Sequence, residues 1–105
     1  MAQRTGNVGK SETIGATLRD LRKRAKLGIK TVAPKVGISY TYLSKIENDV
    51  KRPTPGLVLM LCNHYGADAD NLIARLGAVP EDIQEIVKEY GKEAFDLLRS
   101  TYSSD

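Results

Sequence analysis

The chain contains few of the residues from which metal sites, disulfide frameworks and catalytic centres are built. Of its 105 residues, one is a cysteine (Cys62) and one is a histidine (His64). A single cysteine excludes an internal disulfide framework. Cys62 and His64 stand two positions apart, so on a helix they would point to different faces and could not bind one metal ion well. There is no phosphate-cradling glycine loop either, and we expect no metal, no cofactor and no enzyme activity.

Long apolar runs are also missing. The N-terminal stretch has no apolar segment that could serve as a signal peptide or a membrane span. Together with the lone cysteine, this favours a reducing cytoplasm and no membrane partner. The chain has no internal repeats and no extended low-complexity segment. Its length fits one domain with a short appendage, and such a chain can bury a modest core without disulfides.

Positive charge is concentrated in the first half of the chain. The formal net charge is +3, but residues 1–52 carry 12 Lys or Arg and four acids, whereas residues 53–105 carry four Lys or Arg and nine acids. Nucleic-acid binding requires a basic region of this kind. Basic faces are often only solvated surface, however, so the charge needs support from a binding motif.

Such a motif is present at residues 30–52, KTVAPKVGISYTYLSKIENDVKR. Its apolar residues recur at helical spacing up to Gly37, which permits the left-handed backbone that ends a helix. Ser39 can cap the next helix, because its hydroxyl can accept the free amide hydrogens of the first turn. Leu43 and Ile46 give that second helix a narrow buried stripe and leave the rest of its surface exposed. This is the pattern of a helix-turn-helix unit with a recognition helix for the DNA major groove.

The same signals divide the rest of the chain. Residues 1–10 lack apolar periodicity and predict a flexible basic arm. Residues 11–77 predict a compact all-α domain of five short helices. The predicted helices run from Ser11 or Thr13 to about Lys26, then over 29–36, 40–48 and 55–65, and finally from a cap at Asp68 to Leu76.

Residues 78–105 predict a C-terminal helical segment. Pro80 and the acids after it suit a helix start, because negative charge is favourable at the positive end of the helix dipole. Gly91 favours two helices, about 80–89 and 92–102, over one bent helix. The segment has more large apolar residues than so short an appendage can leave in water, which predicts a dimerisation surface; packing on the parent domain is the alternative. The residues concerned are Ile83, Ile86, Val87, Tyr90, Phe95 and Leu98.

Residues 14–76 resemble the Cro and lambda-repressor type of helix-turn-helix regulators, also called the xenobiotic-response-element family. The matching run includes the turn VAPKVGIS, the helix YLSKIEN and the continuation PTPGLVLMLCNHYGADADNLI. The resemblance implies a five-helix DNA-binding domain whose helix at about 40–48 enters the major groove. It also implies a sequence-specific transcriptional regulator of double-stranded DNA, namely a homodimeric repressor that reads a palindromic operator.

The resemblance assigns roles to individual residues. Positions that reach base edges in this family are matched here by Ser39, Tyr40, Thr41, Ser44 and Lys45. The loop that contacts phosphates is matched by Asn48, Lys51 and Arg52. Arg22 and Glu47 match a recurrent ion pair that orients the recognition helix. For Tyr40 and Tyr42, packing within the domain is the alternative role.

The chain departs from the family pattern in its second helix. Ile29 stands where a polar residue usually contacts the DNA backbone, and Pro34 removes an amide donor within the helix. Lys30 or Thr31 could replace that phosphate contact. A different function also stays open, namely an antitoxin-type module that neutralises a partner protein through its C-terminal helices and regulates its own promoter. Toxin-binding segments are usually longer and more prone to disorder than this short amphipathic tail.

Overall fold

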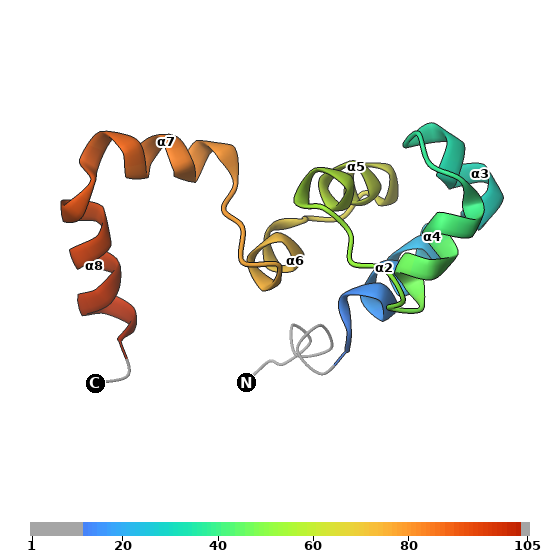
Figure 1. The fold of residues 1–105 in the computed structure, drawn as a ribbon, viewed down its shortest axis with the longest axis horizontal. Coiled ribbons are helices and arrows are strands. Elements are labelled where there is room, and N and C mark those ends of the chain that lie inside the picture. Colours follow the sequence, from blue (N-terminus) through green and yellow to red (C-terminus); the bar gives the residue numbers. More distant parts are fainter. Residues whose placement is uncertain (1–11, 104–105) are drawn as a thin grey trace.

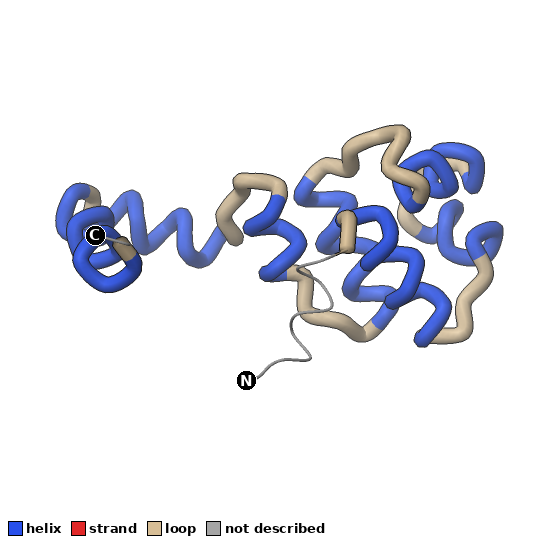
Figure 2. Tube along the Cα trace, turned by 90° about the horizontal axis from the view of Figure 1, so that it is seen from below, coloured by secondary structure: helices blue, strands red, loops and turns tan. Residues whose placement is uncertain are grey.

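The computed structural model describes residues 12–103, and this part of the chain is all-α, with seven helices and no strand (Figures 1 and 2). The arm predicted for residues 1–10 lies outside the described residues. The helices are α2 (Ile14–Arg24), α3 (Ile29–Lys35), α4 (Tyr40–Glu47), α5 (Pro55–Tyr65), α6 (Asp70–Arg75), α7 (Glu81–Tyr90) and α8 (Lys92–Tyr102). The all-α fold expected from the sequence is therefore confirmed.

Threonine and serine side chains begin three of the helices. The hydroxyl oxygens of Thr13, Ser39 and Thr54 each accept a hydrogen bond from a first-turn amide, at distances of 3.0, 3.1 and 3.1 Å. Each bond satisfies an amide that has no partner within the helix. Gly37 and Gly66 have φ values of 78° and 69°, the left-handed conformation that closes a helix. These local signals start α2, α4 and α5, and end α3 and α5, within one residue of where the sequence predicts them.

Several predicted helix ends differ from the observed ones by one or two residues. The first helix ends at Arg24 rather than Lys26, because Lys26 has a φ of 61° and leaves the helical conformation. The cap of α6 is Ala69, and no side chain bonds from that position. Asp68 lies one residue before this cap, and its carboxylate accepts a hydrogen bond from the amide of Asp70, the first residue of α6, at 2.8 Å.

One hydrophobic core joins the helices α2 to α6. Cys62 is fully buried in it, and this burial raises the pKa of the thiol to about 11. His64 lies one position before the buried Tyr65 but is exposed. The buried residues of α5 are Val58, Leu61, Cys62 and Tyr65, whereas Leu57 is only partly buried. The core consists of Leu18, Val32, Ala33, Val36, Leu43, Ile46, Val58, Leu61, Cys62, Tyr65, Ala69, Leu72 and Ile73.

The C-terminal segment forms two helices that stand apart from the bundle of α2 to α5 in both views (Figures 1 and 2). The break between them is at Gly91, whose φ of 54° and ψ of −125° are accessible to glycine but strained for other residues. None of the described side chains of α7 and α8 is buried, so the segment does not bury its apolar stripe on the parent domain. None of the helices in the described part of the chain is long and apolar enough to cross a membrane.

Candidate nucleic-acid interface

Helix α4 divides its surface between the core and solvent. Leu43, Ile46 and Glu47 are buried, which leaves the opposite side of the helix and its first turn uncovered. That uncovered side carries hydrogen-bonding groups, which base edges require. The base-contact residues expected from the sequence are exposed at Ser39, Tyr40, Thr41 and Lys45 and partly buried at Ser44.

The two tyrosines of α4 have different environments. Tyr42 packs against the hydrophobic core and is partly buried. Tyr40 is 50% exposed, and the ammonium nitrogen of Lys30 lies 4.8 Å from the centroid of its ring. This cation–π contact joins the start of α3 to the start of α4. It brings a predicted phosphate-contacting residue and a predicted base-contacting residue to one place on the surface, and the exposed Thr31 follows Lys30 on α3.

Arg22 of α2 and Glu47 of α4 form a two-point ion pair. The arginine Nε lies 2.7 Å from the carboxylate Oε2 and its second terminal nitrogen lies 2.9 Å from Oε1. Arg22 also donates to the carbonyl oxygen of Leu27 at 2.9 Å. The hydrogen bond with Glu47 raises the pKa of Arg22. Because Glu47 is only 3% exposed, the pair holds the last turn of α4 at a fixed angle on α2.

The side chain of Asn48 is engaged within the protein. Its Oδ1 accepts a hydrogen bond from Arg19 at 2.6 Å, and its Nδ2 donates to the carbonyl oxygen of Ser44 at 2.9 Å. Asn48 therefore links α2 to the C-terminal end of α4. Arg19 did not emerge from the sequence analysis. Its side chain is 40% exposed, and it places a further cation beside the end of α4.

A close backbone crossing positions α4, and the sequence analysis did not detect it. A Cβ atom added at Gly15 would lie 2.3 Å from the carbonyl oxygen of Ile46. The amide of Gly15 donates to the carboxylate of Asp49 at 3.0 Å, and Asp49 has a φ of 62°. A glycine near the start of α2 therefore permits the end of α4 to approach. Only the tertiary structure reveals this role, because a glycine in the first turn of a helix has many other uses.

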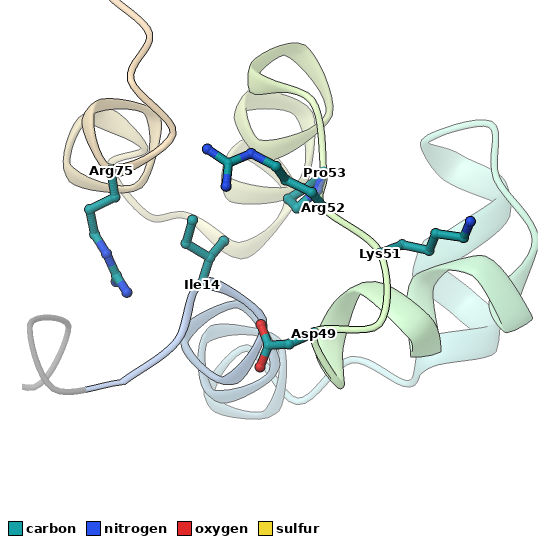
Figure 3. Close-up of a pocket in the computed structure, with 6 residues that line it drawn as sticks. All are labelled: Ile14, Asp49, Lys51, Arg52, Pro53 and Arg75. Atoms are coloured by element: carbon teal, nitrogen blue, oxygen red, sulfur yellow. The ribbon is translucent and has the colours of Figure 1, made fainter.

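The two cations of the loop after α4 leave the loop in opposite directions (Figure 3). Lys51 extends toward the side of α3 and α4, whereas Arg52 extends toward α6 and donates to the carbonyl oxygen of Leu76 at 3.3 Å. They border an open cavity of about 300 Å³. The cavity is lined by Ile14, Asp49, Lys51, Arg52, Pro53 and Arg75. Lys51 therefore extends away from α6, whereas Arg52 is hydrogen-bonded to the residue that follows α6.

These features define a helix-turn-helix module with a braced and partly exposed second helix. The family described as "Helix-turn-helix domain" matches residues 13–76. The chain belongs to this family, and its helix-turn-helix domain is of the Cro and lambda-repressor type. No solved structure matches the chain significantly.

Two curated relatives carry regulatory names. The chain is 36% identical over 80 residues to the HTH-type transcriptional regulator RghRB of Bacillus subtilis. This alignment covers 72% of this chain and 58% of that protein. It is also 36% identical over 58 residues to the propionyl-CoA carboxylase regulator of Cereibacter sphaeroides. That alignment covers 55% of this chain and 13% of the other protein. Together, the family and these relatives support a role in DNA binding and transcription regulation.

Proposed function

We propose that the protein is a transcriptional repressor that binds, as a homodimer, a palindromic operator in double-stranded DNA. Each copy places α4 in the major groove of one half-site. Base edges are contacted by Ser39, Tyr40, Thr41, Ser44 and Lys45. Phosphates are contacted by Lys30, Thr31, Asn48, Lys51 and Arg52.

The observation that carries this proposal is the exposed polar side of α4 on a helix that is fixed at its C-terminal end. A recognition helix must keep its angle when it enters the groove, because a small rotation removes several base contacts together. The ion pair between Arg22 and Glu47 and the close approach at Gly15 restrain that angle. The excess of cations in residues 1–52 supplies attraction to phosphates that is independent of sequence.

Selection of binding sites from random duplex DNA tests the proposal and identifies the operator. The protein should enrich two related half-sites about one helical turn apart. Thr41→Ala and Lys45→Ala should each lose about 1–3 kcal/mol of affinity on the selected site and little on random DNA. Lys23→Ala is the control for Lys45→Ala, since it removes the same charge from an exposed position on α2. Equal weakening on selected and random DNA would show that α4 does not read the bases.

The repressor assignment has its own test. The selected site is placed across a reporter promoter and, in a second reporter, upstream of the same promoter. We expect lower expression only when the site overlaps the promoter, because the bound protein then competes with the transcription machinery. Thr41→Ala should restore expression. Higher expression from the upstream site would make the protein an activator and leave the DNA-binding proposal intact.

A further inference from the structure

The C-terminal helices expose a large amount of apolar surface. Seven large apolar side chains of α7 and α8 are between 40% and 79% exposed. We refer to the apolar surface of these two helices as the C-terminal apolar face. It comprises Ile83, Ile86, Tyr90, Phe95, Leu97, Leu98 and Tyr102, with the partly buried Val87 beside them.

The size of this face matches an interface rather than ordinary protein surface. Aromatic side chains have roughly 150–250 Å² each to bury and Ile and Leu somewhat less, so seven such residues that are about half exposed leave on the order of 700 Å² uncovered. Soluble monomers rarely expose a contiguous apolar patch above ~300–600 Å². Each partner in a standard protein–protein interface contributes about 800 Å². The face is therefore sufficient for one stable interface with a partner of similar size.

Residues 81–102 carry three Lys or Arg and six acids, and the three cations contact acids of their own helices. Lys88 contacts Glu85 at 3.2 Å on α7. On α8, Asp96 contacts Arg99 at 3.1 Å and also contacts Lys92. These charges do not attract a second copy, so the apolar area has to supply the interaction. A two-fold interface brings the face against a copy of itself, so the net charge of −3 on residues 81–102, three cations minus six acids, opposes association and is screened by salt.

We propose that the C-terminal apolar face is the homodimer interface, in which the α7–α8 pair of one copy packs on the α7–α8 pair of a second copy. The partner is thus another molecule of this chain. The inference rests on the proposed function in one respect, since a dimer of this kind would bring two α4 helices to one operator. The interface itself forms without DNA and can be measured without it.

Sedimentation velocity of the full chain, without DNA, tests the inference. The wild-type protein should be a dimer at micromolar concentration. The double variant Ile86→Glu, Leu98→Glu should be a monomer, because it introduces charges into the apolar interface of both copies. Leu59→Glu is the matched control, since Leu59 on α5 is 48% exposed and Leu98 is 49% exposed. This control should remain a dimer.

Two results would overturn the inference. A monomeric wild-type protein would exclude a second copy and leave the face to another kind of protein, as in the antitoxin-type function. A monomeric Leu59→Glu variant beside a dimeric double variant would move the interface to α5. Salt provides a further test: about 0.5 M NaCl should leave the apolar dimer intact, whereas dissociation by salt would indicate a contact made by charges.

DNA binding separates a failure of this inference from a failure of the proposed function. The monomeric double variant should keep the helical circular dichroism spectrum and the base preference of the wild type, but its apparent operator affinity should fall by about 10²–10⁴-fold, because the second half-site is no longer linked. If the variant dissociates as expected but neither protein binds any selected DNA, the interface stands and the DNA-binding proposal fails. If the monomeric variant retains wild-type operator affinity, the interface stands and the proposal that the dimer reads two half-sites fails.

Discussion

Replacing Gly15 by alanine tests the close crossing of α2 and α4. Helix propensity alone predicts stabilisation, since alanine in a helix is favoured over glycine by roughly 0.5–1 kcal/mol. The structure predicts the opposite sign. The new Cβ would lie 2.3 Å from the backbone oxygen of Ile46 and 2.8 Å from that of Glu47. Both obstacles are backbone atoms, so one of the two helices has to move.

Three contributions determine how much Gly15→Ala changes the free energy of unfolding. Forcing a methyl group into a filled space costs about 1–3 kcal/mol. Weakening the hydrogen bond from the Gly15 amide to Asp49 adds about 1 kcal/mol. After the gain in helix propensity is subtracted, we expect the free energy of unfolding to fall by about 1–3 kcal/mol. Operator affinity should fall as well, because α4 is displaced from its angle.

Gly56 provides a matched control on another helix. Gly15 and Gly56 are each the second residue of a helix that follows a threonine cap, in α2 and α5. A Cβ at Gly56 would meet nothing within 4 Å. Gly56→Ala should therefore stabilise the protein by about 0.5–1 kcal/mol. Urea denaturation measures both variants, and a Gly15→Ala variant as stable as Gly56→Ala would refute the reasoning.

Three further predictions concern charge. Glu47→Ala should cost roughly 3–5 kcal/mol in urea denaturation, because it leaves the partly buried Arg22 without its carboxylate; a loss below 1 kcal/mol would show that the pair does not hold α4. Lys51→Ala should reduce the logarithmic salt slope of DNA binding by about 0.9, whereas Arg52→Ala should change it less, since Arg52 is bonded to α6; equal slopes would contradict the opposite orientations. Because burial raises the pKa of Cys62 from 9.0 to about 11, the folded state holds a proton that the unfolded state releases between these values. Stability should therefore fall from pH 9 to pH 11, by up to ~1.4 kcal/mol per pH unit, and this loss should be smaller in Cys62→Ser.

The fold could be predicted from the sequence where local chemistry decides the structure. Thr13, Ser39 and Thr54 accept first-turn amides, and the apolar spacing between such caps and the following glycines marks the helices. Asp68 shows the limit of this approach. An aspartate can serve as the cap or accept an amide from one residue outside it, and both arrangements fit the same sequence. Choosing between them requires the path of the neighbouring chain.

The candidate interface was less accessible to sequence reasoning, because tertiary contacts determine the direction of its side chains. Lys51 and Arg52 are adjacent in sequence and alike in charge, yet Arg52 turns to the end of α6. Asn48 was predicted to contact phosphates. In the structure its side chain is hydrogen-bonded to Arg19 and to the carbonyl oxygen of Ser44 on α4. None of these directions follows from residue type or spacing. Their contribution to DNA binding stays a prediction.

The bend at Gly91 determines which apolar residues of the C-terminal segment can act together. From Ile83 to Leu97, the residues Ile83, Val87, Tyr90, Ala94 and Leu97 are spaced alternately by four and three, which is the seam of a coiled coil if the helix is continuous. A continuous helix over residues 81–102 would be a rod of about 33 Å. The positive φ of Gly91 instead turns the chain between α7 and α8, so the coiled-coil seam is interrupted and a shorter, broader apolar surface replaces it. One residue without a side chain thus selects between two ways in which the same segment could associate.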